Sequence, residues 1–543
     1  MDSRLFDVLS RPTTTLGLTI ALSSIFYWAY YSYTNRISGI PWVGRNDKEW
    51  FASRKARHRG MVDPASIHRE GYEKYSKNDK PFYFPTEDGC DTVILPPSQV
   101  SWLASQPEPI LSAMDAMRTL LQTDYMFDPH ALLNPVQNFT TRVLLTRRLP
   151  VMIPGMVEEM GIALDEFFGT DTENWKEIPI VDTLREVAAR ISNRAFVGDP
   201  LCRNQEYLNN LLILSGAIGM NAAALRNMNP LLRPLRSWWA TRDFRNAFKE
   251  VAKFTNPVVL QRIQDIKSRE KGDLKTKEPM DFLQAMIHQS LAQPYAKDAT
   301  PNMITLRITL MNFASVQNLS KAGSNTILDL VNAPADQPVL DVLRKELESV
   351  MGGSADLTKE HISKMEKLDS VIKESLRISH GATTGFHREV RAPSGVKLWN
   401  GQWVPNGTLL GVSAISQHHD DDYYSDALKW QPFRFYEDSH REDPGSIAPD
   451  VASVEVSKDV DQAEYIRQKQ NSLTATSDTF LTFGHGVHAC PGRFYSAVAL
   501  KVLIMAVLQR YHLRPQTERS ENIWESGAYI PSSSAVVEVM RKK

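Results

Sequence analysis

The segment that most limits what this chain can fold into lies near its C-terminal end, where residues 480–494 read FLTFGHGVHACPGRF. Glycines on both sides of Cys490 allow tight turns and a close approach of the backbone to a flat ligand. Backbone N–H groups of such a turn, together with the positive end of a helix starting near Arg493, stabilise a thiolate. A lone cysteine is more often a buried packing residue. The residues around Cys490 are therefore needed to decide between a packing residue and a functional thiolate.

That spacing matches a known pattern. Phe483, Gly486, His488, Cys490 and Gly492 occupy F-x-x-G-x-[HR]-x-C-x-G, which resembles the haem-ligand loop of the cytochrome P-450 superfamily of haem-thiolate enzymes. The resemblance implies that Cys490 ligates the iron of haem (iron protoporphyrin IX) through its thiolate. It also implies that Phe483 covers the sulfur, that Gly486 lets the backbone approach the macrocycle, and that His488 binds a haem propionate.

Further matches extend the resemblance over the chain. Glu374 and Arg377 fit the family's E-x-x-R, and Arg434 resembles the arginine that completes this triad. The resemblance implies that the triad is structural and holds the core around the haem loop. Arg142 lies where the family often has W-x-x-x-R, with Asn138 in place of the tryptophan. By resemblance Arg142 binds a haem propionate, while an ordinary surface arginine is the alternative.

Hydrophobic periodicity predicts a mainly α-helical fold with small β-sheets. Apolar residues recur at three-to-four spacing, which is typical of helices, over 152–168, 180–196, 242–268, 301–330, 339–350 and 359–378. Short β-branched and aromatic runs predict strands at 82–84, 92–95, 396–399, 408–412 and 535–540. The polar stretch 437–478 is expected to wander over the surface. Since no linker or repeat divides the 543 residues, we expect one large cytochrome P-450-like domain, residues 36–543, with haem-thiolate activity.

The N-terminal region differs from the rest. Residues 13–33 carry no charge and are mostly apolar, and about 20 helical residues span the hydrocarbon core of a bilayer. A cleaved signal peptide or a core helix is the alternative, but the run is long and ends in aromatic residues suited to the membrane interface. Residues 1–35 are therefore predicted to be a single-pass anchor, and positive charges follow the apolar run. The catalytic domain would then face the cytosol from the endoplasmic reticulum membrane.

The central helix departs from the resemblance. Most monooxygenases of the family carry A/G-G-x-D/E-T there, whereas residues 314–320 read ASVQNLS. The acid position holds Gln317 and the alcohol position Asn318. Amides hydrogen-bond oxygen and order water but donate protons poorly, so Asn318 is expected to orient water, with help from Ser315 or Ser320. Alternatively, the two amides only cap a local kink.

Three functions are therefore compatible with the sequence. The first is an oxygen-activating monooxygenase that hydroxylates, epoxidises or oxidises its substrate in several steps. The second is a reductase-independent isomerase, dehydratase or rearrangement enzyme, because amides in this helix resemble those of hydroperoxide-isomerising relatives. The third is a non-catalytic haem-binding protein.

Composition limits the partners. With 62 Lys+Arg against 63 Asp+Glu, the chain lacks the basic field of a nucleic-acid binder. Three cysteines, Cys90, Cys202 and Cys490, build no disulfide framework, which indicates a reducing compartment. Residues 194–203, RAFVGDPLCR, resemble filamentous-fungal members of the superfamily. This resemblance and the anchor imply a lipophilic secondary-metabolite substrate. No flavin domain is visible, so we expect a separate NADPH–cytochrome reductase as the electron donor. The arginine- and tryptophan-containing residues 229–239 are expected to touch the membrane or to connect core helices.

Overall fold

The computed structural model describes residues 17, 19–26, 37, 39–86, 90–272, 275, 277–354, 356–440, 460–525 and 528–543. The expected anchor, residues 1–35, falls outside the described residues except for positions 17 and 19–26, which are helical.

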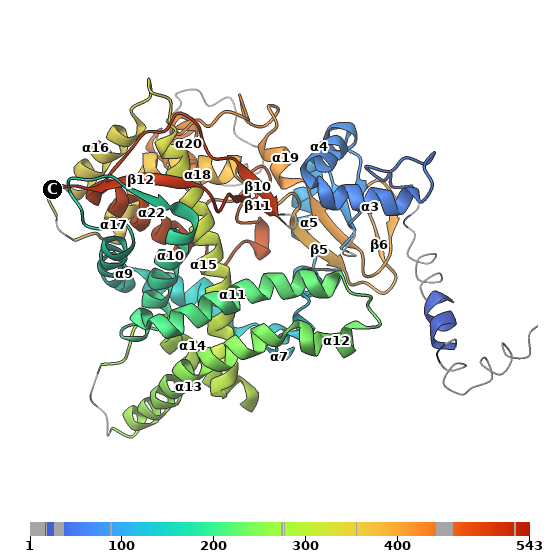
Figure 1. Ribbon diagram of the computed structural model, residues 1–543, viewed down its shortest axis with the longest axis horizontal. Coiled ribbons are helices and arrows are strands. Elements are labelled where there is room, and N and C mark those ends of the chain that lie inside the picture. The colour runs from blue at the N-terminus through green and yellow to red at the C-terminus, as the bar shows by residue number, and fades with distance from the viewer. Residues whose placement is uncertain are drawn as a thin grey trace, which may run out of the picture.

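Long helices make up most of the molecule (Figure 1). The longest are α9 (Thr146–Phe167), α10 (Ile180–Phe196), α11 (Gln205–Arg226), α13 (Arg242–Glu270), α15 (Pro301–Val331) and α22 (Arg493–Arg510). Helices of intermediate length are α3 (Ala52–Val62), α4 (Pro64–Lys74), α6 (Ala113–Leu121), α12 (Arg233–Ala240), α14 (Phe282–Leu291), α16 (Val339–Met351), α18 (Glu366–Ile378) and α21 (Val460–Asn471). Short ones are α5 (Val100–Ser105), α7 (His130–Leu133), α8 (Val136–Phe139), α17 (Lys359–Ser363), α19 (Ala414–His418) and α20 (Arg434–Ser439).

The strands form small sheets. A five-stranded sheet has the order β1-β2-β8-β5-β3, formed by β1 (Phe82–Phe84), β2 (Thr92–Leu95), β8 (Leu409–Val412), β5 (Gly385–Val390) and β3 (Leu111–Ser112). β2 and β8 are parallel, with Thr92 opposite Leu409, and the other pairs are antiparallel. The remaining sheets contain β4 (Lys176–Pro179), β12 (Val536–Arg541) and β9 (Tyr511–Leu513), then β10 (Asn522–Glu525) with β11 (Ala528–Pro531), and β6 (Val396–Lys397) with β7 (Trp403–Val404).

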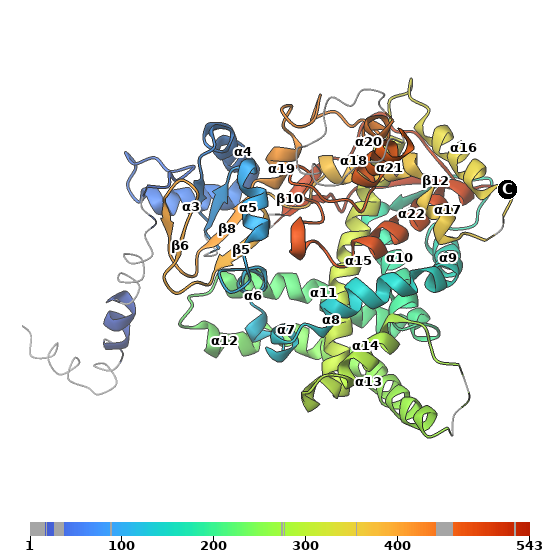
Figure 2. The same ribbon diagram turned by 180° about the vertical axis from the view of Figure 1, so that it is seen from behind.

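Helix α15 is the axis of the helical part. Its start follows from local chemistry, because Thr300 Oγ1 accepts the N–H of Met303 and Pro301 occupies the first turn, where a missing N–H costs nothing. It packs against α10, α11, α13, α18 and α22. In Figure 2 it runs through the middle of the molecule, while the five-stranded sheet with α3 and α4 forms one end. A helix in this position can present its middle turns to an internal site.

The expected mainly α-helical class with small sheets is confirmed. The helices predicted at 180–196 and 301–330 correspond to α10 and α15 within one residue at each end. Two local expectations were wrong. Residues 359–378 form two helices, since the carboxylate of Glu346 accepts the N–H groups of Lys367 and Leu368 at 2.7 and 3.0 Å and so caps a separate start of α18. Of the polar stretch 437–478, residues 441–459 lie outside the described residues, and the part that follows contains helix α21, whose end is held by Lys373 Nζ on the carbonyls of Gln470 and Asn471.

Among the described residues, one helix is long and apolar enough to cross a membrane, namely α11. Half of its most apolar window is buried within the fold, and α11 packs against α13 and α15. Such burial is typical of a core helix.

Candidate active site

The cysteine loop, residues 480–494, leads into α22. The N–H of Cys490 donates to the carbonyl of Phe483 at 2.7 Å, which closes the loop. Gly484 and Gly486 have φ of 66° and 70°, a backbone region that side chains disfavour. A Cβ at Gly486 would also lie 3.1 Å from Cβ of Ala104. Gly484 and Gly486 are therefore required by the turn itself.

Cys490 is a free, half-buried cysteine. Burial raises the pKa of its thiol, while the N–H groups of Gly492 and Arg493 and the charge of Arg493 act in the opposite direction. The N–H groups expected to favour the thiolate are thus present, and burial outweighs them. A bound cation is what would favour the thiolate in this position.

Basic residues gather beside the loop. Arg142 Nη2 donates to the carbonyl of Val487 at 3.1 Å, and His488 Nε2 lies 3.3 Å from a carboxylate oxygen of Glu108. Burial lowers the pKa of His488, as do the charges of Arg388 and Arg142, against the opposing charge of Glu108. Two residues predicted to bind propionates, Arg142 and His488, are therefore close enough to interact.

Arg388, on β5, belongs to the same group and was missed by the sequence reading. Its side chain is buried, and Nη1 donates to the carbonyl of His387 at 2.8 Å. Its Nε and Nη2 have no hydrogen-bond partner among the residues that the structure describes. Burial lowers its pKa to about 10, with Glu108 opposing. A charged residue within a strand, two positions from Phe386, was the available signal, but only the fold shows that it is buried beside the loop.

The middle of α15 exposes a narrow face. Ala314 and Asn318 are exposed although the helix is otherwise mostly buried, and a spacing of four puts them on one face. Asn318 Nδ2 donates to the carbonyl of Ala314 at 2.8 Å. Gln317 Nε2 donates to Ser215 Oγ of α11 at 3.1 Å, so the two amides have different surroundings.

The two serines proposed as helpers are engaged elsewhere. Ser315 Oγ lies 2.8 Å from Ser192 Oγ of α10, and Ser320 Oγ donates to the carbonyl of Gln317 at 3.1 Å. The helix continues unbroken through this segment, so the amides do not cap an interruption. Asn318 is the polar side chain that this turn leaves exposed.

Helix α15 and the cysteine loop meet through Thr141. Its Oγ1 is 3.5 Å from the sulfur of Met311, one turn before Ala314. A Cβ on Gly492 would lie 3.8 Å from Cγ2 of Thr141 and 3.9 Å from the sulfur of Cys490. The sulfur and the central helix are thus brought to one place by residues far apart in sequence.

The triad supports this arrangement. Arg377 donates to both carboxylate oxygens of Glu374 at 2.7 and 2.8 Å, and Arg434 Nε lies 3.2 Å from the same carboxylate. All three side chains are at most 6 % exposed. They form the structural cluster implied by the resemblance.

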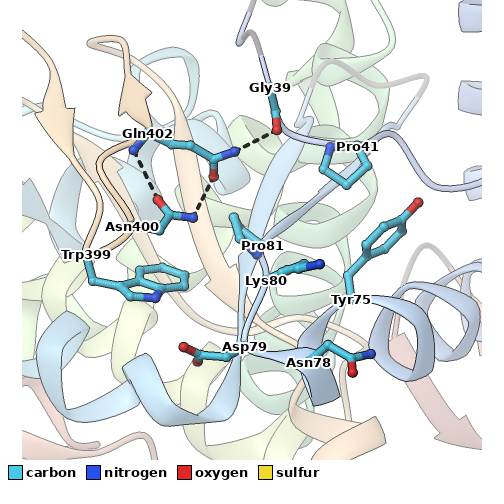
Figure 3. A pocket seen from close by; sticks show the side chains of 10 residues that line it. All are labelled: Gly39, Pro41, Tyr75, Asn78, Asp79, Lys80, Pro81, Trp399, Asn400 and Gln402. Carbon is cyan, nitrogen blue, oxygen red and sulfur yellow. Dashed lines mark hydrogen bonds between the residues drawn. The ribbon is translucent and has the colours of Figure 1, made fainter.

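A pocket of about 460 Å³ lies elsewhere, beside the β6–β7 hairpin (Figure 3). It is lined by residues such as Tyr75, Lys80 and Trp399, and Gln402 bridges it by donating to the carbonyl of Gly39 at 2.6 Å. None of the predicted site residues lines it.

The residues around Cys490 fit a haem. Within the described part of the chain, no three His, Cys, Asp or Glu side chains come together to hold a metal ion. The partnerless N–H groups of Arg388, with Arg142 and His488 nearby, suit the carboxylates of such a macrocycle. A glycine-rich cysteine loop beside these cations defines a haem-thiolate protein.

Comparison with known families agrees. A model described as cytochrome P450 matches residues 123–539. The chain therefore belongs to the cytochrome P450 family, whose cofactor is haem with an axial thiolate.

Individual relatives are fungal. The chain is 29% identical over 511 residues to the cytochrome P450 monooxygenase htyF of Aspergillus rugulosus, covering 92% of this chain and 72% of the relative. It is 28% identical over 538 residues to pbrC of Penicillium brasilianum, also a cytochrome P450 monooxygenase, covering 97% of this chain and 96% of that relative. A third, gloP of Glarea lozoyensis, is 28% identical over 92% of this chain and 91% of its own. The chain is accordingly an enzyme of the cytochrome P450 monooxygenase class.

Proposed function

We propose that this enzyme uses dioxygen and reductase-supplied electrons to oxidise a lipophilic intermediate of secondary metabolism by hydroxylation, epoxidation or several successive steps. The observation that carries the proposal is the Cys490 loop, closed by the bond to Phe483 and linked to α15 through Thr141. The names of the fungal relatives support the reaction class. A separate NADPH–cytochrome reductase is the proposed electron donor.

The loop residues have distinct proposed roles. Cys490 would hold the haem iron through its thiolate, and Phe483 would pack over the loop and limit water at the sulfur, which raises the effect of each N–H donor there. Gly486 permits the turn. Arg142 and His488 bind the propionates, and Arg388 joins them because its unsatisfied guanidinium gains most from an anionic partner.

Haem, when bound, supplies the redox chemistry by which one oxygen atom of dioxygen is inserted into a substrate. Asn318 is exposed on α15, and its Nδ2 is engaged on the carbonyl of Ala314, which leaves Oδ1 as an acceptor. An acceptor orients a water molecule or a substrate hydroxyl. Since an amide is a poor acid, protons would pass through that ordered water.

The proposal is tested by a reduced-CO difference spectrum of the haem-loaded protein. The wild type should show the band of thiolate-ligated haem, and Cys490→Ala should abolish it. Cys202→Ala is the matched control, since Cys202 is buried in a 3-10 turn and should leave the band unchanged. An unaltered band in Cys490→Ala would contradict the assignment.

Membrane attachment belongs to the same proposal. Residues 1–35 are the proposed anchor, and residues 36–543 the catalytic domain on the cytosolic side of the endoplasmic reticulum. Helix α12 supports this by exposing Leu235, Trp238 and Trp239 at 65–74%. Aromatic and apolar side chains beside arginines are typical of a helix lying at the membrane interface.

A rearrangement enzyme is the second candidate, because Gln317 and Asn318 replace the acid and the alcohol on α15. Such an enzyme converts a substrate that already carries an activated oxygen and needs no reductase. Conversion of a lipid hydroperoxide without reductase and NADPH, absent in Cys490→Ala, would favour it. Turnover that depends on both would favour the monooxygenase.

A further inference from the structure

His418 is the last residue of α19 and is fully buried. Its imidazole Nε2 accepts the N–H of Leu481 at 3.0 Å. Leu481 stands at the start of the cysteine loop, and its own carbonyl accepts the N–H of Gly484 at 2.9 Å. The ring of one histidine thus fixes the entry into the turn that carries Cys490.

The same residue touches the triad on its other side. The main-chain carbonyl of His418 accepts a hydrogen bond from Nη1 of Arg377. Arg377 Nη1 also donates to the carbonyl of Ala427 at 2.8 Å, while its other nitrogens hold Glu374. His418 therefore contacts the triad through its backbone and the cysteine loop through its side chain.

Packing leaves the ring little freedom. It stacks on Phe480, with centroids 5.5 Å apart and planes 14° from parallel. His380 meets it edge-on at 4.8 Å. Because the ring is clamped on two sides, Nε2 is presented to Leu481 at a defined position.

The ring must be neutral to accept a hydrogen bond at Nε2. Its surroundings favour that form, since burial lowers the pKa of His418 well below its usual value, and the charges of His380, Arg377 and His419 act in the same direction.

We infer that His418 is a positioning residue that transmits the order of the Glu374–Arg377–Arg434 triad to the haem-ligand loop. The hydrogen bond to Leu481 and the closing bond from Cys490 to Phe483 lie in succession along the loop. Losing the first lets the loop entry shift, and the sulfur is then held less firmly. This inference rests on the proposed role of Cys490 as the ligand.

The test compares substitutions in the full-length, haem-loaded protein. His418→Phe keeps a flat ring on Phe480 but removes the acceptor, and His418→Leu removes both. His418→Gln keeps an oxygen acceptor near the position of Nε2. His419→Gln is the neighbouring control, because His419 contacts the carbonyl of Ile378 instead, at 2.8 Å.

Two readouts other than activity are measured, namely the thiolate-ligated fraction in the reduced-CO spectrum and amide hydrogen exchange of the peptide containing Leu481. We expect exchange at Leu481 at least tenfold faster and a smaller thiolate-ligated fraction in His418→Phe. His418→Gln and His419→Gln should stay near wild type. If His418→Phe and His418→Leu yield no folded protein while His418→Gln does, the requirement for the acceptor is likewise supported.

The inference is overturned if His418→Phe matches wild type in both readouts, or if His418→Gln is as impaired as His418→Phe, since packing alone would then explain the residue. Failure of the ligand assignment is a separate result, because Cys490→Ala would then retain the thiolate band whatever the His418 variants do.

Discussion

At the scale of single residues, Arg388 shows how a fold can hold a cation ready for an anionic partner. Its guanidinium is buried, and two of its nitrogens have no hydrogen-bond partner among the described residues. The guanidinium carbon lies 4.4 Å from the ring centroid of Phe386. An unsatisfied buried donor costs about 1–3 kcal/mol. A carboxylate that binds to the guanidinium removes this cost. The unsatisfied donor therefore weakens the fold without ligand and strengthens the binding of an anionic ligand.

Arg388→Leu should therefore have opposite effects on the stability of the fold and on the binding of haem. The haem-stripped protein should gain about 1 kcal/mol in free energy of unfolding, because a poorly solvated cation is removed. The loaded protein should release haem about tenfold faster, since a charge-assisted hydrogen bond is lost. Urea denaturation and haem transfer to an acceptor protein measure the two quantities.

The control is Arg391→Leu. Arg391 follows the same strand but is exposed, with a 3.2 Å pair to Asp115, and such pairs contribute little. It should change neither quantity beyond experimental error. A loss of stability in stripped Arg388→Leu would contradict the prediction.

Cys490 and Arg388 also show which site residues can be predicted from their neighbours in the sequence and which cannot. The cysteine was predicted because the residues of its motif, from Phe483 to Gly492, lie within a few positions of it. Arg388 was not, because its partners Glu108 and His488 come from distant segments, and burial is a property of the whole fold. Ser315 or Ser320 was expected to help Asn318, and in the structure their hydroxyls hydrogen-bond Ser192 of α10 and the carbonyl of Gln317.

At the scale of elements, α18 and α16 offer a comparison of one spacing in two environments. Arg377 and Glu374 form an i,i+3 pair with both side chains at 0% exposure. Arg344 and Asp341 on α16 also form an i,i+3 pair, but their side chains are 25% and 66% exposed. Breaking a buried pair leaves an uncompensated charge, whereas an exposed pair is solvated and screened.

We expect Arg377→Ala to reduce the free energy of unfolding by about 3–5 kcal/mol and to lower haem content. Arg344→Ala should cost at most about 0.5 kcal/mol. Chemical denaturation of both variants measures the difference. Equal losses would show that spacing, and not burial, determines the strength of the pair.

The contact between α18 and α21 depends on Lys373. Its ammonium lies 4.3 Å from the ring centroid of Phe435 and donates to the carbonyls of Gln470 and Asn471. Burial lowers its pKa to about 7, against the charges of Asp369 and Asp438. Holding this lysine charged inside the fold is therefore unfavourable.

The sign of the pH effect follows. Between about pH 7 and the usual lysine pKa near 10.5, the unfolded chain binds the proton and the folded one does not. Lys373 thus makes stability rise with pH over this window, by up to about 1.4 kcal/mol per unit, and below pH 7 its full cost is present. Lys373→Met should flatten that rise and stabilise the protein at pH 7. Denaturation series from pH 6.5 to 10 measure it, and an unchanged slope would contradict the assignment.

At the scale of the whole molecule, α12 lies at the end of the α11 and α13 pair, on the side that carries the five-stranded sheet (Figures 1 and 2). No residue of α12 is buried. The guanidinium of Arg245 lies 3.8 Å from the ring centroid of Trp238, so the indole is held at the surface. A surface of this kind is an interaction site for lipid or protein.

Changing Trp238 and Trp239 together to serine in protein lacking residues 1–35 should reduce binding to phospholipid vesicles about tenfold, because interfacial binding scales with buried apolar area. Stability should be almost unchanged, since neither side chain is buried. Vesicle sedimentation measures binding. Replacing the still more exposed Trp50 by serine tests whether the effect is specific to α12. Undiminished binding of the double variant would contradict membrane contact.

The sequence by itself determined the mainly α-helical class, the position of the central helix and the cysteine turn, because periodicity, caps and glycine conformations act over a few residues. The triad could be named from its order along the chain. Tertiary structure alone decided that Arg388 joins Arg142 and His488, that Asn318 and not Ser315 stays exposed, and that His418 links the triad to the loop. Each of these depends on burial and on partners more than a hundred residues away or on another element, which local rules do not encode.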